Sequence, residues 1–112
     1  TRPDLAFILG VLARHCNTPL EAHLNSVKEV MRYLQGTRDN QLSYGVTARD
    51  NKLVAFCDAN FAGDKTGAKS TSAYIIMLNG GTVAFHSKLQ TIVAQSTTEA
   101  EVIALAEFRR LL

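Results

Sequence analysis

The stretch that decides the fold is TSAYIIMLNGGTVAF, residues 71–85. Residues 71–78 are rich in β-branched and aromatic side chains, which are typical of strands. Asn79-Gly80 is a dipeptide that strongly favours a two-residue hairpin turn, because both residues readily adopt positive φ angles. Residues 82–85 return to a β-forming composition. The sequence therefore predicts an antiparallel hairpin.

Another strand and a helix flank this hairpin along the chain. Residues 53–57 form a continuous apolar run that ends at Asp58, as in a strand covered on both faces. After the hairpin, Ser96 and Glu99 have the spacing of a capping box, which predicts a helix over residues 97–112. One stripe of that helix, which we expect to face the core, carries the side chains at i, i+4, i+7 and i+11. These are Glu101, Leu105, Phe108 and Leu112.

The first forty residues follow a helical pattern instead. Residues 4–16 are mostly apolar and predict one helix. The sequence TPLE at residues 18–21 resembles a capping box with proline at the first helical position, and predicts a second helix that stops near Gly36. A polar stretch follows this stop. We therefore predict a helix pair in residues 1–40 and an α+β part in residues 41–112.

The composition narrows the class of protein. Of the 112 residues, 46% are hydrophobic and 20% are charged, which suits a small packed domain or a piece of a larger one. The net charge of +2 is too small to indicate nucleic-acid binding by itself. No apolar stretch approaches the ~20 residues that a membrane-spanning helix needs. The two cysteines, Cys16 and Cys57, lack the spacing of a metal site, and we expect buried free thiols.

Two carboxylates are the candidate catalytic groups. Asp58 ends the apolar strand, and Glu101 lies near the start of the last predicted helix. Each has an ordinary interpretation, Asp58 as a turn former and Glu101 as a carboxylate favoured by the helix dipole. Together, however, they suit Mg²⁺, which prefers oxygen ligands. In phosphodiester hydrolysis two such ions activate water and stabilise the leaving oxygen.

Lysines and hydroxyl groups occur near this acidic pair in the sequence. Lys69 and Lys88 are candidates for contacts with phosphates, and Ser70 and Ser72 for hydrogen bonds to a nucleic-acid backbone. The ordinary alternatives are solvated surface lysines and hydroxyls that begin a strand.

Six short motifs in register resemble one known family, the Pol polyproteins of copia-type retrotransposons. Four of them resemble its ribonuclease H region: residues 58–64 (DANFAGD), 69–72 (KSTS), 87–90 (SKLQ) and 96–101 (STTEAE). Two upstream motifs, at residues 1–4 (TRPD) and 32–37 (RYLQGT), resemble the segment that connects reverse transcriptase to this nuclease. The resemblance covers nearly the whole chain.

The resemblance implies an α+β fold in which the helix pair precedes a partial ribonuclease H-like domain of three antiparallel strands and a helix. It implies two-metal hydrolysis of the RNA strand of RNA–DNA hybrids, with Mg²⁺ or Mn²⁺ held by Asp58 and Glu101 as the catalytic carboxylates. The implied partners are the hybrid and the rest of the Pol polyprotein, namely reverse transcriptase and the remaining ribonuclease H segment, with no membrane. The implied location is intracellular, in cytoplasmic particles or the nucleus.

The family has further catalytic aspartates on strands that would follow residue 112. We therefore expect the 112-residue chain to be a truncated N-terminal part of the nuclease domain that is nearly inactive alone. The alternative is a non-catalytic nucleic-acid-binding or assembly module with the same fold. A third interpretation is an ordinary α+β fragment whose acidic residues only cap helices and form turns.

Overall fold

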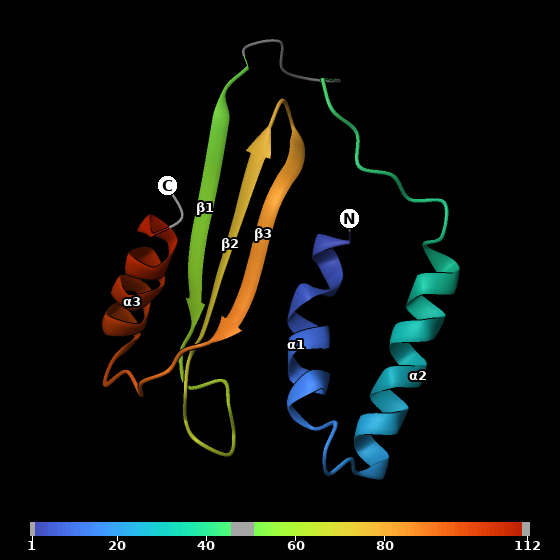
Figure 1. The fold of residues 1–112 in the computed structure, drawn as a ribbon, viewed down its shortest axis with the longest axis vertical. Coiled ribbons are helices and arrows are strands. Elements are labelled where there is room, and N and C mark those ends of the chain that lie inside the picture. The colour runs from blue at the N-terminus through green and yellow to red at the C-terminus, as the bar shows by residue number, and fades with distance from the viewer. Residues whose placement is uncertain (1, 46–50, 111–112) are drawn as a thin grey trace. The chain divides into compact units, whose positions relative to one another are not determined.

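The structure is a computed structural model that describes residues 2–45 and 51–110. The chain divides into two compact units, Thr1–Leu42 and Ser43–Leu112, each described by itself below (Figure 1). Together they hold helices and a three-stranded antiparallel sheet, which confirms the predicted α+β class. None of the described helices combines the length and the apolar character that crossing a membrane requires.

The first unit is a pair of helices. A short 3-10 turn, η1 (Pro3–Leu5), leads into α1 (Ala6–Arg14), and α2 (Glu21–Gly36) follows after a loop. The prediction that the second helix opens at residues 18–21 was wrong by two residues, because Leu20 is the N-cap and has an extended backbone. The Nδ1 atom of His23 accepts a hydrogen bond from the Leu20 backbone N–H at 3.0 Å. This bond satisfies a donor that the helix start would otherwise leave unpaired.

A polar clamp connects the start of the first unit to the end of α2. The Arg2 Nη2 atom donates to Asp4 Oδ2 at 2.8 Å and to Thr37 Oγ1 at 2.7 Å. The Tyr33 hydroxyl donates to Asp4 Oδ2 at 2.8 Å. With a further bond from Arg2 Nε to Oδ1 at 3.1 Å, Asp4 accepts three hydrogen bonds, two of them from a cation, and these contacts favour its ionised form.

We expect this clamp to weaken in acid. The hydrogen bond from Arg2 lowers the pKa of Asp4 to about 2, and the hydrogen bond from Tyr33 contributes in the same direction. Because the folded pKa lies below the unfolded value of about 3.9, the stabilisation is complete above pH 4 and is lost as the pH falls through 2. The chemical shifts of Tyr33 and Thr37 should therefore change between pH 4 and pH 2. Asp4→Asn should remove this transition, whereas Asp39→Asn should leave it in place.

The second unit is built on the predicted hairpin. The strands β1 (Leu53–Asn60), β2 (Thr71–Leu78) and β3 (Gly81–Leu89) pair in the order β1-β2-β3, all antiparallel. Asn79 and Gly80 connect β2 to β3 with φ angles of 50° and 81°, as the turn chemistry requires. The predicted hairpin is confirmed, with its second strand longer than expected.

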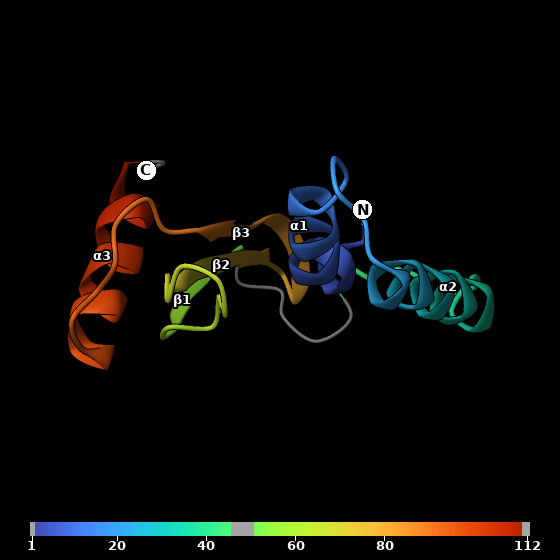
Figure 2. The same ribbon diagram turned by 90° about the horizontal axis from the view of Figure 1, so that it is seen from below.

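Helix α3 (Thr97–Arg109) packs against β1 and β2 of this sheet (Figure 2). Its start confirms the predicted capping, because Ser96 Oγ accepts from the Glu99 backbone N–H at 3.1 Å. The predicted core stripe of the helix is confirmed at Phe108 but was wrong at Glu101 and Leu105. Glu101 is exposed and Leu105 is 58% exposed, while Leu112 lies outside the described residues. The buried stripe is instead Ala100, Ala104 and Phe108.

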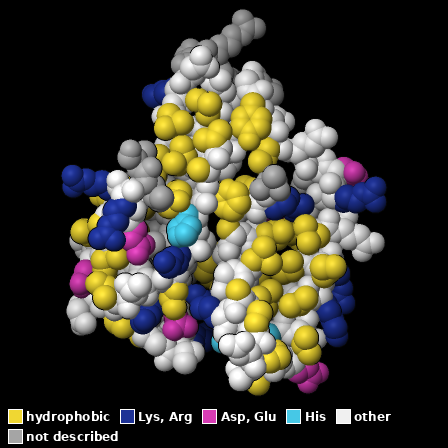
Figure 3. Space-filling view, in the orientation of Figure 1, with side chains coloured by type: hydrophobic (Ala, Val, Ile, Leu, Met, Phe, Trp, Pro, Cys, Tyr) yellow, Lys and Arg dark blue, Asp and Glu magenta, His cyan; other side chains and the backbone are white. Residues whose placement is uncertain are grey.

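The prediction that β1 is covered on both faces was also wrong. It pairs only with β2 in the described sheet, and Leu53 and Phe56 are 54% and 57% exposed. Figure 3 shows hydrophobic side chains gathered on the visible surface of the sheet. The apolar composition of β1 therefore exceeds what its neighbours in the described structure bury, which is typical of a strand that needs a further covering element.

Candidate metal and nucleic-acid site

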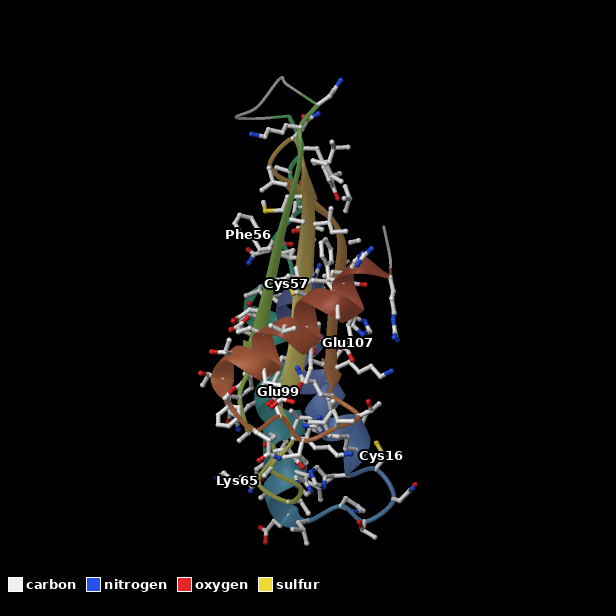
Figure 4. All side chains as sticks on the ribbon, turned by 90° about the vertical axis from the view of Figure 1, so that its left-hand side faces the viewer. Cys16, Phe56, Cys57, Lys65, Glu99 and Glu107 are labelled. Carbon is white, nitrogen blue, oxygen red and sulfur yellow. The ribbon has the colours of Figure 1, made fainter. Side chains whose placement is uncertain are left out.

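A groove lies between the end of β1 and the first turns of α3. It is lined by Cys57 from the strand and by five helix residues, Thr97, Thr98, Glu101, Val102 and Leu105. Figure 4, which looks onto α3, shows Cys57 at the strand beside this helix. Both sequence-predicted carboxylates belong to this neighbourhood: Glu101 lines the groove, and Asp58 follows Cys57 directly in β1.

The pKa of the Cys57 thiol depends on its burial and on the carboxylates near it. Burial raises the pKa of the Cys57 thiol, and the negative charge of Glu101 raises it further, with a smaller contribution from Asp58. The thiol is therefore protonated at neutral pH, and it is a poor nucleophile and a poor metal ligand. The predicted free thiols are present, but only Cys57 is partly buried, whereas Cys16 is exposed.

Asp58 and Glu101 do not face each other across the groove. Side chains alternate along a strand, so Asp58 points to the opposite side of β1 from Cys57, whereas Glu101 lies on the Cys57 side. Asp58 is exposed and pairs in register with Ala73 of β2. In the described sheet β1 is an outer strand. The two carboxylates therefore lie on opposite faces of this one strand, with no further described strand beside it.

The donor chemistry of this pair fits a hard divalent cation. In the part of the chain that the structure describes, neither Asp58 nor Glu101 forms a salt bridge or a side-chain hydrogen bond. Exposed carboxylates without a protein partner are available to Mg²⁺, which accepts one or two of them and retains waters. No group of three His, Cys, Asp or Glu side chains in the described ranges is arranged to hold a metal. The residues therefore fit part of a metal site.

Gln90, which the sequence reasoning did not single out, fixes the helix that carries Glu101. Its side chain is 1% exposed, and its Nε2 atom donates to Ser72 Oγ at 3.0 Å and to the Ala100 carbonyl oxygen at 2.9 Å. It thus joins β2 to α3 one residue before Glu101. The signal available in the sequence was the motif SKLQ at residues 87–90, but its glutamine had no assigned role.

The predicted nucleic-acid contacts differ in accessibility. Ser70 and Ser72 are 0% and 3% exposed, and Ser70 Oγ accepts a hydrogen bond from the Ala62 backbone N–H at 3.1 Å. These hydroxyls hold the loop and Gln90 in place and do not reach the surface described here. Lys69 is half-buried and Lys88 is exposed, and both lie at the end of the sheet near the loop after β1. The prediction of phosphate contacts therefore depends on these two lysines.

Comparison with known proteins places these features in a family. The chain is 46% identical over 107 residues to the secreted RxLR effector protein 161 of Plasmopara viticola, covering 96% of this chain and 75% of that protein. It is 43% identical over 107 residues to the retrovirus-related Pol polyprotein from transposon TNT 1-94 of Nicotiana tabacum, covering 96% of this chain and 8% of the polyprotein. No family model matches the sequence. No solved structure matches it either.

Further relatives are of the same type. The Pol polyprotein from transposon RE2 of Arabidopsis thaliana is 39% identical over 108 residues. The match covers 95% of this chain but only 7% of that polyprotein. Relatives at 38–43% identity over nearly the full chain are thus Pol polyproteins of copia-type transposons. The chain therefore belongs to the family that includes the RxLR effector protein 161 and the corresponding segment of these retrotransposon Pol polyproteins.

Proposed function

We propose that the chain is a piece of the reverse transcriptase–ribonuclease H region of a Pol polyprotein. Residues 41–112 form the N-terminal part of a ribonuclease H-like domain, and residues 1–40 are the helical connection that precedes it. The parent activity is hydrolysis of the RNA strand of RNA–DNA hybrids. The observation that carries this proposal is that Asp58 of β1 and Glu101 of α3, on either side of this outer strand, have no salt bridge or side-chain hydrogen bond within the described residues.

Each residue has a defined task in this proposal. Asp58 and Glu101 would hold Mg²⁺ or Mn²⁺, which supplies the activation of water and the stabilisation of the leaving oxygen. Gln90 and Ser72 position the helix that carries Glu101. Lys69 and Lys88 would meet phosphates of the hybrid. The proposed partners are the hybrid and the remaining Pol polyprotein, in an intracellular setting.

Two carboxylates alone bind a pair of dications weakly, because positive charge stays in excess and coordination positions stay open. The resemblance to the ribonuclease H region implies further aspartates that would complete the proposed site. In the described sheet, β1 has an exposed apolar surface and one edge that pairs with no other strand. Both features support the same proposal, since a neighbouring strand would cover β1 and bring in another carboxylate.

We expect the isolated chain to bind Mn²⁺ weakly at this edge. Paramagnetic broadening in a Mn²⁺ titration should affect the amide signals of Cys57, Asp58 and Glu101 first, because Mn²⁺ substitutes for Mg²⁺ at oxygen ligands. Asp58→Asn or Glu101→Gln should raise the dissociation constant at least about tenfold. The matched control Asp39→Asn removes one carboxylate elsewhere and should change nothing. Broadening at these signals that survives both site substitutions would exclude the proposed metal ligands.

A second candidate is a non-catalytic binding or assembly module. It is favoured by one finding: the chain spans 75% of the secreted RxLR effector protein 161, a protein much shorter than the Pol polyproteins. In that effector protein, the segment similar to this chain occurs without most of the polyprotein that surrounds it in TNT 1-94. In this case the fold is kept for its surface, and the two carboxylates would contribute nothing to binding.

A further inference from the structure

An apolar stripe begins at Leu20, the N-cap of α2, and continues along the outer face of this helix, and no described residue of the first unit covers it. Its four residues are largely exposed: Leu20 by 65%, Leu24 by 55%, Val27 by 42% and Met31 by 62%. The intervals between them are four, three and four residues, which is the heptad spacing of a helix–helix seam. Scattered exposed apolar residues are ordinary, but four in heptad register form a contact surface.

This stripe points away from α1. The side of α2 that faces α1 is marked by the groove between the two helices, to which α2 contributes Ser26, Glu29, Val30 and Tyr33. At 100° per residue, the centre of the stripe lies about 140° around the helix from the centre of these four residues. Helix α1 therefore packs on a different side of α2 and leaves the stripe exposed.

Charged residues on one flank of the stripe make it self-complementary. Glu21 and Lys28 are both exposed and lie seven residues apart, so they occupy equivalent positions beside the seam. In an antiparallel pair of identical helices, this flank of one helix meets the same flank of the other in reversed order. Each Glu21 then meets Lys28 of the partner subunit. A parallel pair would instead bring His23 near the partner's Lys28, which offers no opposite charge.

We propose that the outer face of α2 binds a second copy of this chain, with the two α2 helices antiparallel about a two-fold axis. In this register Leu24 packs on the partner's Val27, and Leu20 packs on the partner's Met31, giving four symmetric layers. Two equivalent ion pairs between Glu21 and Lys28 of the partner subunit border the seam. Identical contacts in both directions are what an isologous dimer requires.

The dimer is weak, because the seam is short. Helix α2 has 16 residues, and one such helix from each copy buries less than the roughly 1,200 Å² of a stable standard interface. We expect a dissociation constant of about 10 µM to 1 mM for such a small interface. The concentration series used to test the dimer must therefore span this range.

The test is sedimentation equilibrium of the full chain and of charge variants over that series. The wild type should show a monomer–dimer equilibrium, and Glu21→Lys or Lys28→Glu should each weaken it at least about fivefold, because like charges then meet twice per dimer. The double variant Glu21→Lys/Lys28→Glu should return to within about twofold of the wild type. Lys65→Glu makes the same charge change in the other unit and should have no effect.

Two results would overturn this proposal. One is a wild type that remains monomeric at 1 mM. The other is a dimer whose stability the single variants leave unchanged, or that the double variant fails to restore, since association would then use another surface. All the substituted side chains are exposed, and helical circular dichroism of each variant verifies that α2 is intact.

Discussion

Asp58→Asn should abolish cleavage of an RNA–DNA hybrid when residues 41–112 replace the corresponding segment of a complete Pol polyprotein. We expect a TNT 1-94 Pol polyprotein that carries this segment in place of its own to cleave the RNA strand of a hybrid in Mg²⁺. The substitution should lower the cleavage rate more than about 100-fold, because it removes one of the negative charges that would hold the dications in the proposed site. Glu101→Gln should cause a loss of the same order. The measurement is single-turnover cleavage of a labelled hybrid.

Asp64→Asn is the matched control for this result. Asp64 Oδ2 accepts a hydrogen bond from the Gly67 backbone N–H at 2.8 Å, and an asparagine oxygen accepts the same bond. The rate should therefore stay within a few-fold. Cleavage that persists with Asp58→Asn would contradict the catalytic assignment. A chimera that binds the hybrid in a salt-dependent way without cleaving it would favour the non-catalytic module instead.

The elements that the sequence predicted well are governed by local chemistry. The turn at Asn79 and Gly80 is specified by two residues that tolerate positive φ, and the start of α3 by a serine whose hydroxyl caps its own helix. Such signals need no information about distant parts of the chain. Both were confirmed to within a few residues for that reason.

The features that the sequence did not reveal depend on tertiary contacts. Periodicity counted Leu105 as a core residue of α3, yet the sheet accepts the alanine stripe instead, since Ala100 and Ala104 let the helix approach closely. The surface beneath includes the polar Ser72 and Gln90, which no hydrophobic pattern marks. Likewise, the apolar run of β1 predicted a strand covered on both faces, but in the described structure Leu53 and Phe56 are 54% and 57% exposed, because composition does not specify which element would cover them.

The candidate site also has some features that the sequence predicted and others that depend on tertiary contacts. Asp58 and Glu101 were selected by their residue type and by motif, and the structure places both beside Cys57. Their arrangement on either side of β1 could not be read from the sequence, because it depends on which face of the strand α3 covers. The role of Gln90 in fixing α3 was missed for a similar reason: its two partners lie 18 and 10 residues away.

Phe108→Ala should destabilise the second unit more than any other single truncation. Phe108 is 9% exposed, and its ring lies 5.4 Å from that of Tyr74 on β2, measured between centroids. The other buried apolar side chains described in this unit are alanines, at positions 94, 100 and 104. Removing a buried phenylalanine costs about 3–5 kcal/mol. Small domains are stable by only about 5–15 kcal/mol, so much of the stability is lost.

Urea unfolding of the chain should show this loss as a lower transition midpoint. Phe108→Leu keeps an apolar side chain against Tyr74 and should cost clearly less than the alanine variant. Val102→Ala, at a helix position that is 59% exposed, should change the free energy of unfolding by no more than about 0.5 kcal/mol. Equal effects of Phe108→Ala and Val102→Ala would show that α3 is not held by the face seen here. Glu101 would then have no fixed position beside β1, because the docking of α3 is what places it there.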